Sequence, residues 1–246
     1  MKIIVEKDYE KMSSKAASLI SEAIQKKPDL ILGLATGSTP IGTYEELIRM
    51  HKEEGLDFSK VTTFNLDEYY GLSPEDDQSY RYFMENTLFK HINIKKENTY
   101  VPDGLAKDPN AYGKEYDEKI QKQGGIDIQI LGIGRNGHIA FNEPDDELIL
   151  STHLTGLTKD TIDANSRFFD SIDKVPTKAI TMGLGTIMKA KKIILLANGK
   201  NKTEIMGELL KQDKVTTNLP ASLLLLHPDV TVIMDEEAAE LYKKNL

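Results

Sequence analysis

The sequence predicts an α/β protein with a single doubly wound, mainly parallel sheet and helices on both of its faces. Short apolar runs of strand length alternate with segments of helical periodicity along the chain. Glycine, proline and aspartate stand at the boundaries between these segments. No internal repeat, low-complexity tract or Gly/Ser linker interrupts the 246 residues, so we expect one domain spanning 1–246.

The first half of the chain alternates regularly between strand and helix signals. Tyr9, Met12 and Ala16 begin an apolar face of helical spacing, and Pro28 ends that helix. Asp108 and Pro109 are typical of an N-cap followed by proline in the first helical turn. Further helices are expected from near Pro40 and over Tyr80–His91, and a glycine pair at 124–125 ends the helix that Asp108 begins. The expected strands are Lys2–Val5, Leu30–Leu34, Val61–Leu66 and Ile126–Leu131.

The second half continues the alternation. Its expected strands are Ala179–Met182, Ile193–Ala197 and Val230–Met234, and its expected helices lie near 157–166, 185–190, 200–212 and 235–244. Strands joined through helices form crossovers, which favours a parallel sheet covered on both faces. Ligands of such sheets bind beyond the carboxyl ends of the strands. The residues directly after each strand are therefore the candidates for function.

Composition limits the partners and the compartment. The net charge of −8 argues against non-specific binding to nucleic acid or to an acidic membrane surface. The chain has no cysteine, which excludes disulfides, thiolate metal sites and thiol nucleophiles. No stretch approaches the ~18 uncharged apolar residues of a membrane helix, and no signal peptide is recognisable. We expect a cytoplasmic protein.

The first candidate segment, Thr36-Gly37-Ser38, follows the strand Leu30–Leu34. Such a turn presents backbone N–H groups and hydroxyls at the positive end of the next helix, which is an anion site. It lacks the lysine and the length of a P-loop, which disfavours a nucleoside triphosphate. The alternative is an ordinary turn in which Thr39 is the helix N-cap.

The second candidate segment is the acidic pair Asp67-Glu68, at the end of the strand Val61–Leu66. A partly desolvated carboxylate at this position can act as a general base on a carbon acid. The alternative is a solvated turn without chemistry.

The third candidate segment is Gly132–Pro144. Its glycines have the spacing of a dinucleotide-binding turn, but Pro144 interrupts the regular helix that such a turn requires. Instead the loop carries Asn136, His138 and Glu143. A histidine exchanges protons near neutral pH, and a carboxylate can orient it. Two alternatives are a histidine satisfied within a turn and a metal site that combines His138, Glu143 and Asp67.

Two isolated cations complete the set of candidates. Lys202 lies where the strand Ile193–Ala197 passes into a helix, and a lysine at a helix start is unfavourable unless an anion binds there. Arg167 follows the expected helix near 157–166 and can supply a bidentate fork to phosphate oxygens. The alternative for each is an ordinary surface charge.

Taken together, these motifs resemble the glucosamine/galactosamine-6-phosphate isomerase family over essentially the whole chain. The matching segments are Thr36–Pro40, Phe64–Tyr69, Gly132–Pro144, Ala164–Phe169 and Pro220–Ser222. The resemblance implies a modified Rossmann-like fold, no metal and no organic cofactor. It also implies deamination of glucosamine 6-phosphate to fructose 6-phosphate and ammonia in amino-sugar catabolism.

The resemblance also implies residue roles. Asp67 moves the proton between C2 and C1, and His138 opens the sugar ring with help from Asn136 and Glu143. The substrate and its phosphate are bound by Thr36, Gly37, Ser38, Gly137, Arg167 and Lys202. Some members have aspartate where Asn136 stands, so the negative charge beside His138 has to come from Glu143. Allosterically activated members use basic residues after this loop, whereas 151–157 offers only His153, and we expect no such activation.

Two other functions are considered beside this one. A 6-phosphogluconolactonase-like hydrolase shares the Gly-His pair but typically has aspartate before that glycine and lacks the Phe-Asn-Glu-Pro continuation. A non-catalytic sugar-phosphate-sensing module would need the phosphate turn but no proton-transfer groups. The combination of Asp67, His138 and Glu143 favours the deaminase. The sequence does not distinguish a monomer from a homo-oligomer.

Overall fold

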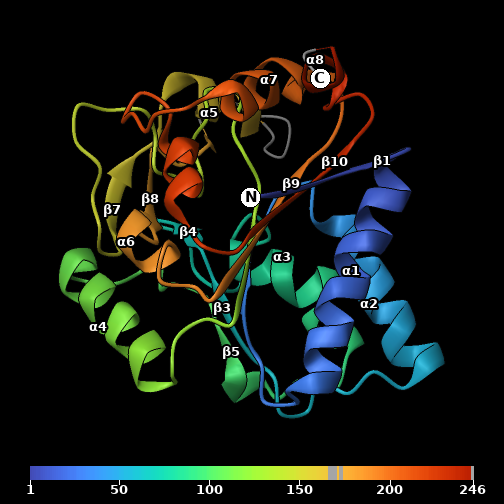
Figure 1. The fold of residues 1–246 in the computed structure, drawn as a ribbon. Helices are drawn as coiled ribbons and strands as arrows, with labels where there is room; N and C mark the ends of the chain where they lie inside the picture. Colours follow the sequence, from blue (N-terminus) through green and yellow to red (C-terminus); the bar gives the residue numbers. More distant parts are fainter. Residues whose placement is uncertain (166–170, 172–173, 245–246) are drawn as a thin grey trace.

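The computed structural model in Figure 1 describes residues 1–165, 171 and 174–244. Its main sheet has seven strands in the order β1-β10-β9-β6-β2-β3-β5, paired in parallel throughout. The strands are β1 (Lys2–Glu6), β2 (Ile31–Leu34), β3 (Thr62–Asn65), β5 (Thr99–Tyr100), β6 (Ile128–Leu131), β9 (Lys192–Ala197) and β10 (Val230–Asp235). The predicted fold class is confirmed.

The order in which the chain adds strands to the sheet reverses between β2 and β6. From β2 the chain builds outward through β3 to β5, and from β6 it builds the other way through β9 to β10. The carboxyl ends of two neighbouring strands whose connections diverge leave a crevice, where open α/β sheets bind their ligands. All residues of β2 and β6 are buried, so the two strands form a rigid floor below this crevice.

Helices surround the sheet. In Figure 1, α1 and α2 lie packed together on one side of the strands, and α4 and α6 lie on the other. The α-helices are α1 (Tyr9–Lys26), α2 (Ile41–Glu54), α3 (Tyr80–Thr87), α4 (Pro109–Lys122), α5 (Lys159–Asn165), α6 (Leu184–Ile187), α7 (Thr203–Lys211) and α8 (Glu240–Lys243). The 3-10 turns are η1 (Phe89–His91), η2 (Lys96–Asn98), η5 (Lys200–Lys202) and η6 (Pro220–Leu226).

A second, antiparallel sheet was not predicted. It consists of β4 (Asp67–Tyr69), β8 (Lys178–Thr181) and β7 (His153–Gly156), with β8 in the middle. The run expected at Ala179–Met182 is thus a strand, but it belongs to this small sheet rather than to the main one. Asp-Glu-Tyr is too short and polar to predict a strand by itself. It becomes one because β8 pairs with it, Asp67 opposite Thr181.

Other boundaries also differ from the predictions. The helix expected over Tyr80–His91 divides into α3 and η1, because Leu88 leaves helical geometry at φ −138°. The helix expected over 235–244 is only Glu240–Lys243 long. Asp108 is confirmed as an N-cap, since its carboxylate accepts the N–H of Ala111 at 3.0 Å.

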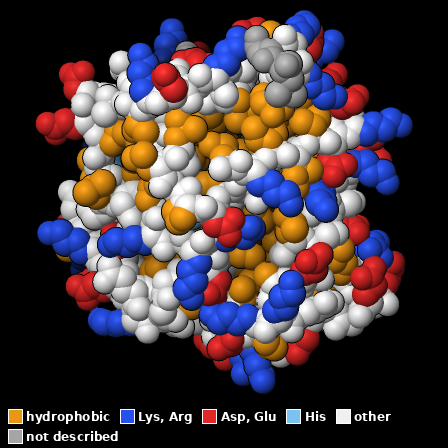
Figure 2. Space-filling model, viewed as in Figure 1, with side chains coloured by type: hydrophobic (Ala, Val, Ile, Leu, Met, Phe, Trp, Pro, Cys, Tyr) orange, Lys and Arg blue, Asp and Glu red, His pale blue; other side chains and the backbone are white. Residues whose placement is uncertain are grey.

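The surface and the helices are those of a globular α/β protein. The face in Figure 2 has acidic and basic side chains interspersed around apolar areas, rather than one broad field of a single sign. Among the helices that the structure describes, none is both long and apolar enough to cross a membrane.

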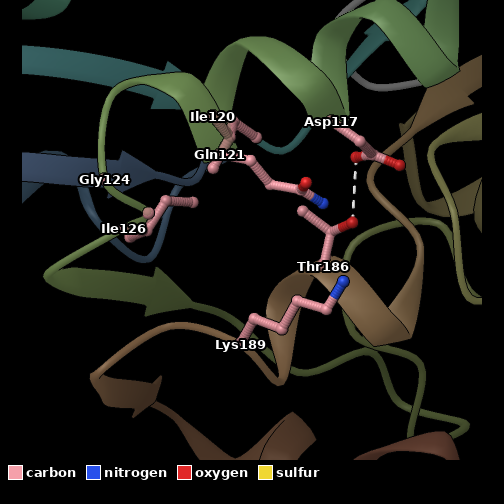
Figure 3. Close-up of a pocket in the computed structure, with 8 residues that line it drawn as sticks. Asp117, Ile120, Gln121, Gly124, Ile126, Thr186 and Lys189 are labelled. Carbon is pink, nitrogen blue, oxygen red and sulfur yellow. Dashed lines mark hydrogen bonds between the residues drawn. The ribbon is translucent and has the colours of Figure 1, made fainter.

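Helix α4 packs against the start of β7 through a glycine and an aspartate. A Cβ placed on Gly113 would lie 2.1 Å from the backbone oxygen of Thr152, so only glycine permits this approach. Asp117 accepts hydrogen bonds from the N–H and the hydroxyl of Thr152, at 2.8 and 2.6 Å. It also accepts one from the hydroxyl of Thr186 at 2.9 Å, beside a cavity of about 300 Å³ (Figure 3). These contacts fix β7, which leads the chain toward α5.

We therefore expect Gly113→Ala to destabilise the protein by about 1–3 kcal/mol, because the added methyl group has to displace backbone. The measurement is the free energy of unfolding in urea. Gly156→Ala is the matched control, since Gly156 ends β7, the strand that α4 packs against, and a Cβ there meets nothing within 4 Å. Equal stability of both variants would contradict this account of the packing.

Candidate active site

The largest group of predicted residues lines one cavity of about 460 Å³ at the carboxyl edge of the main sheet. Most of its lining comes from the segments that follow β2, β3, β6 and β9, four neighbouring strands of the main sheet, and the rest from α3 and α5. Of the predicted site residues, the lining includes Thr36, Gly37, Ser38, Asp67, Asn136, His138 and Lys202. The structure thus brings together side chains from distant parts of the sequence, from Thr36 to Lys202.

The turn after β2 contributes one wall. Thr36, Gly37 and Ser38 line the cavity immediately before α2, whose N-terminus is the positive end of the helix dipole; in its first turn the N–H of Gly42 donates to the hydroxyl of Tyr9 at 2.8 Å. The alternative in which Thr39 caps this helix is wrong, because Pro40 occupies the N-cap position. The Thr39 hydroxyl instead donates to Oδ1 of Asn198 at 2.8 Å and ties this turn to the segment after β9.

Asp67 comes from the junction of β3 and β4 and is only 5% exposed. The alternative of a solvated turn is therefore wrong. Burial, together with the neighbouring charge of Glu68, raises the pKa of the Asp67 carboxyl to about 8, and a hydrogen bond with Thr36 opposes the shift. A carboxylate with so high a pKa binds protons far more strongly than an exposed one.

Glu68 is also buried, but its carboxylate is occupied by backbone hydrogen bonds. Its carboxylate accepts three backbone N–H groups, from Tyr69 at 2.8 Å and from Tyr80 and Arg81 at 2.9 Å each. Burial raises the pKa of Glu68 to about 7, although these hydrogen bonds oppose the shift. By binding the first N–H groups of α3, Glu68 fixes the helix whose Tyr80 lines the cavity beside Asp67.

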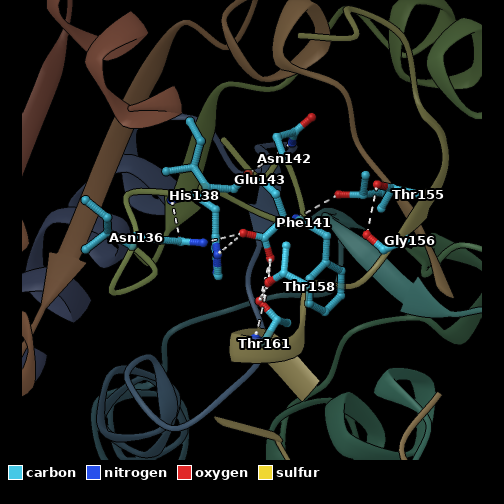
Figure 4. Close-up of polar contacts among 12 residues, drawn as sticks. Asn136, His138, Phe141, Asn142, Glu143, Thr155, Gly156, Thr158 and Thr161 are labelled. Carbon is cyan, nitrogen blue, oxygen red and sulfur yellow. Dashed lines mark hydrogen bonds and ion pairs between the residues drawn. The ribbon is translucent and has the colours of Figure 1, made fainter. Parts of the chain in front are cut away.

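The loop after β6 supplies the second reactive group. Figure 4 shows that His138 and Asn136 both face the carboxylate of Glu143. Oε2 of Glu143 lies 3.0 Å from Nδ1 of His138 and accepts a hydrogen bond from Nδ2 of Asn136 at 2.6 Å. Oδ1 of Asn136 in turn accepts the backbone N–H of His138 at 3.3 Å.

Glu143 determines how His138 can exchange protons. Burial alone would raise the pKa of Glu143, but the hydrogen bond and charge of His138, with Thr161 and Asn136, lower it to about 2. The carboxylate is therefore ionised and can only accept hydrogen bonds. Nδ1 of His138 must then carry the proton, which leaves Nε2 to give or take one.

The backbone of this loop is unusual. Ala140 is the one non-glycine residue with positive φ among those the structure describes, at 53°. Gly137 has φ 85°, and a Cβ there would lie 2.2 Å from Cδ1 of Leu219. Gly137, which was predicted to bind substrate, is not among the residues that line the cavity, and it lets the loop turn against Leu219.

The predicted cations have different outcomes. Nζ of Lys202 donates to the backbone oxygen of Ile133 at 2.6 Å, so the ammonium lies at the base of the loop that carries His138. Arg167 lies outside the described residues. His153, the possible cation of 151–157, is buried, and burial lowers its pKa.

Sequence reasoning missed several residues of the cavity. Tyr80, Phe141, Thr161, Arg135 and Asp163 also line it. Phe141 and Tyr80 stack at a 6.2 Å ring separation, and Tyr69 joins them in a small aromatic cluster. The run Tyr-Tyr-Gly after Asp67-Glu68 is a sequence signal for aromatic contacts near the site, but no pattern in the sequence indicates that Thr161 lines the cavity. Among the described residues, no three His, Asp or Glu side chains form a metal-binding group.

Comparisons with known proteins show which family this chain belongs to. Residues 6–233 match the family described as glucosamine-6-phosphate isomerases/6-phosphogluconolactonase. A glucosamine-6-phosphate deaminase of Clostridium beijerinckii is 60% identical over 99% of this chain and 100% of its own. That of Thermoanaerobacter pseudethanolicus is 58% identical over 98% and 95%. The solved structure of a monomeric glucosamine-6-phosphate deaminase is 48% identical, with a TM-score of 0.96 over 98% of this chain and 100% of that one. A 6-phosphogluconolactonase from Trypanosoma cruzi, 23% identical with a TM-score of 0.74 over 97% and 96%, shares the fold.

The pKa of Asp67 has a consequence for stability. Between about pH 4 and pH 8 the folded protein keeps a proton on Asp67 that the unfolded chain releases, so this residue makes folding less favourable as the pH rises. We expect the free energy of unfolding of Asp67→Asn at pH 8 to exceed that of wild type by about 1–3 kcal/mol, which would also raise its unfolding temperature. The advantage should shrink toward pH 5. A variant less stable than wild type at pH 8 would contradict the buried carboxylate.

Proposed function

The chain belongs to the family of glucosamine-6-phosphate isomerases and 6-phosphogluconolactonases, and we propose that it is a glucosamine-6-phosphate deaminase. The reaction converts glucosamine 6-phosphate and water to fructose 6-phosphate and ammonia. The observation that carries the assignment of roles is that a buried carboxylate of raised pKa, Asp67, lines the same cavity as the imidazole of His138. The reaction needs one group for each of its two proton transfers.

Ring opening is the first proton transfer. The anomeric hydroxyl has to lose a proton and the ring oxygen has to gain one. His138 suits this step, because Nε2 can accept the first proton and deliver it while Nδ1 stays bonded to Glu143. The ionised Glu143 stabilises the imidazolium that exists between the two transfers. Asn136 is uncharged and holds the Glu143 carboxylate in place beside the loop that carries His138, through its hydrogen bonds to Glu143 and to the backbone N–H of His138.

Isomerisation is the second proton transfer. Asp67 in its ionised form takes the proton from C2, and the electron pair of the C–H bond forms the C1–C2 double bond. The C1 oxygen takes a proton from the substrate's ammonium group, so that the C1 carbonyl becomes an enol. The same carboxyl group then returns a proton to C1, which leaves an imine at C2. A pKa near 8 favours both directions of this transfer near neutral pH. Water adds to the imine, and the C–N bond breaks to release ammonia and the ketone.

Binding of the phosphate holds the reacting carbons over these groups. The turn Thr36-Gly37-Ser38 and Lys202 lie on the cavity wall, and we assign the phosphate to them together with Arg167. The support is the helix N-terminus that follows the turn and the cation from the segment after β9. Because the phosphate is remote from C1 and C2, its binding energy serves to orient them.

We also propose that residues 1–246 act as one catalytic domain in the cytoplasm. The single domain is supported by the main sheet, which joins strands from both ends of the chain. The compartment is supported by the charge of the substrate, because an anionic sugar phosphate does not cross a membrane unaided.

The function is tested by ammonia release from glucosamine 6-phosphate. We expect wild type to release ammonia and form fructose 6-phosphate, and Asp67→Asn to lose at least ~10²-fold in kcat with KM largely kept, because general-base catalysis contributes that much. Lys202→Met is the contrasting variant, with its main effect on KM. Hydrolysis of 6-phosphogluconolactone, without ammonia release from the amino sugar, would instead identify a lactonase. Unchanged kcat in Asp67→Asn would remove this residue from the mechanism.

A further inference from the structure

The carboxylate of Glu143 is held from two sides. Its Oε2 faces the catalytic loop, while its Oε1 faces two threonines at the start of α5 (Figure 4). The hydroxyl of Thr161 donates a hydrogen bond to Oε1, and the hydroxyl of Thr158 lies 3.2 Å from the same oxygen. Neither threonine was a candidate from the sequence.

The two threonines also hold each other. Their hydroxyl oxygens are 3.1 Å apart, and Oγ1 of Thr158 accepts the backbone N–H of Thr161 at 3.3 Å, as an N-cap does. Thr161 is only 5% exposed and lines the cavity. Both hydroxyls are therefore fixed by the first turn of α5.

This arrangement fixes the rotation of the carboxylate. If only one oxygen of a glutamate is hydrogen-bonded to protein, the carboxylate can rotate about the Cγ–Cδ bond while its other oxygen is bound by water. With donors on both oxygens, Oε2 stays directed at Nδ1 of His138 and Nδ2 of Asn136. The hydroxyl of Thr161 also helps to keep Glu143 ionised.

Resting on the proposed function, we propose that Thr158 and Thr161 are positioning residues of the reaction: through Oε1 of Glu143 they keep His138 in the tautomer that opens the sugar ring. Neither threonine needs to touch a reacting atom for this role. The consequence of losing them is a histidine whose Nδ1 is no longer held as a donor, and hence slower proton exchange at Nε2.

The test compares isosteric and conservative variants. Thr161→Val removes the hydroxyl and keeps the shape, and Thr161→Ser keeps the hydroxyl. We expect the valine variant to lose at least about 10-fold in kcat with KM changed less than about threefold, and the serine variant to recover most of the loss. Thr158→Val should show a smaller loss in the same direction.

Thr155 provides a matched control. Its hydroxyl donates to the backbone oxygen of Gly156 at 3.3 Å, and Figure 4 shows it apart from Glu143. Thr155→Val makes the same chemical change in the strand that precedes the two threonines. We expect it to keep the kcat and KM of wild type.

A second measurement needs no substrate. Nitrogen NMR of histidine-labelled protein reports which ring nitrogen of each of the five histidines carries the proton, and His138→Gln identifies the signal of His138. Wild type and Thr161→Ser should show His138 protonated at Nδ1, and Thr161→Val should lose that preference. This measurement decides the proposal even if wild type releases no ammonia, a result that would refute the proposed function alone.

Valine variants that keep both kcat and the Nδ1–H tautomer would overturn the proposal, and so would a fall in kcat without a change of tautomer. If Thr161→Val does not fold, Thr158→Val with the same two measurements decides the question.

Discussion

The burial of one carboxylate, that of Asp67, is the constraint on which the rest of the site depends. The residue stands where β3 ends and β4 begins, so the parallel main sheet fixes it on one side and the small antiparallel sheet fixes it on the other. Taking a carboxylate out of water costs free energy, and its raised pKa expresses that cost. The fold tolerates this residue because the surrounding strands are rigid and well packed.

The site contains two carboxylates in opposite environments. Asp67 has few donors around it and holds its proton up to about pH 8, whereas Glu143 has donors on both oxygens and stays ionised down to about pH 2. Groups whose pKa values are pushed apart in this way can divide proton transfer and charge stabilisation between them. Asp67 can thus move protons on carbon, while Glu143 serves the histidine as a fixed negative charge.

The sequence predicted the fold class and several residues of the cavity because both follow from local patterns. Strand-length apolar runs predict the main sheet, and the rule for parallel sheets directs attention to Thr36, Asp67 and His138 at strand ends. The small sheet could not be predicted, since Asp67–Tyr69 has no strand pattern of its own and pairs with residues more than 100 positions away. Thr158 and Thr161 were missed for a similar reason: hydroxyls are common near helix starts, and only the folded chain brings them to Glu143.

The most direct test of this account is the titration of the Asp67 carboxyl carbon by ¹³C NMR in the free protein, with its signal identified by comparison with Asp67→Asn. The account predicts a midpoint near pH 8. A midpoint near pH 4, the ordinary range of an exposed aspartate, would mean that water reaches this carboxylate and that the desolvated base does not exist.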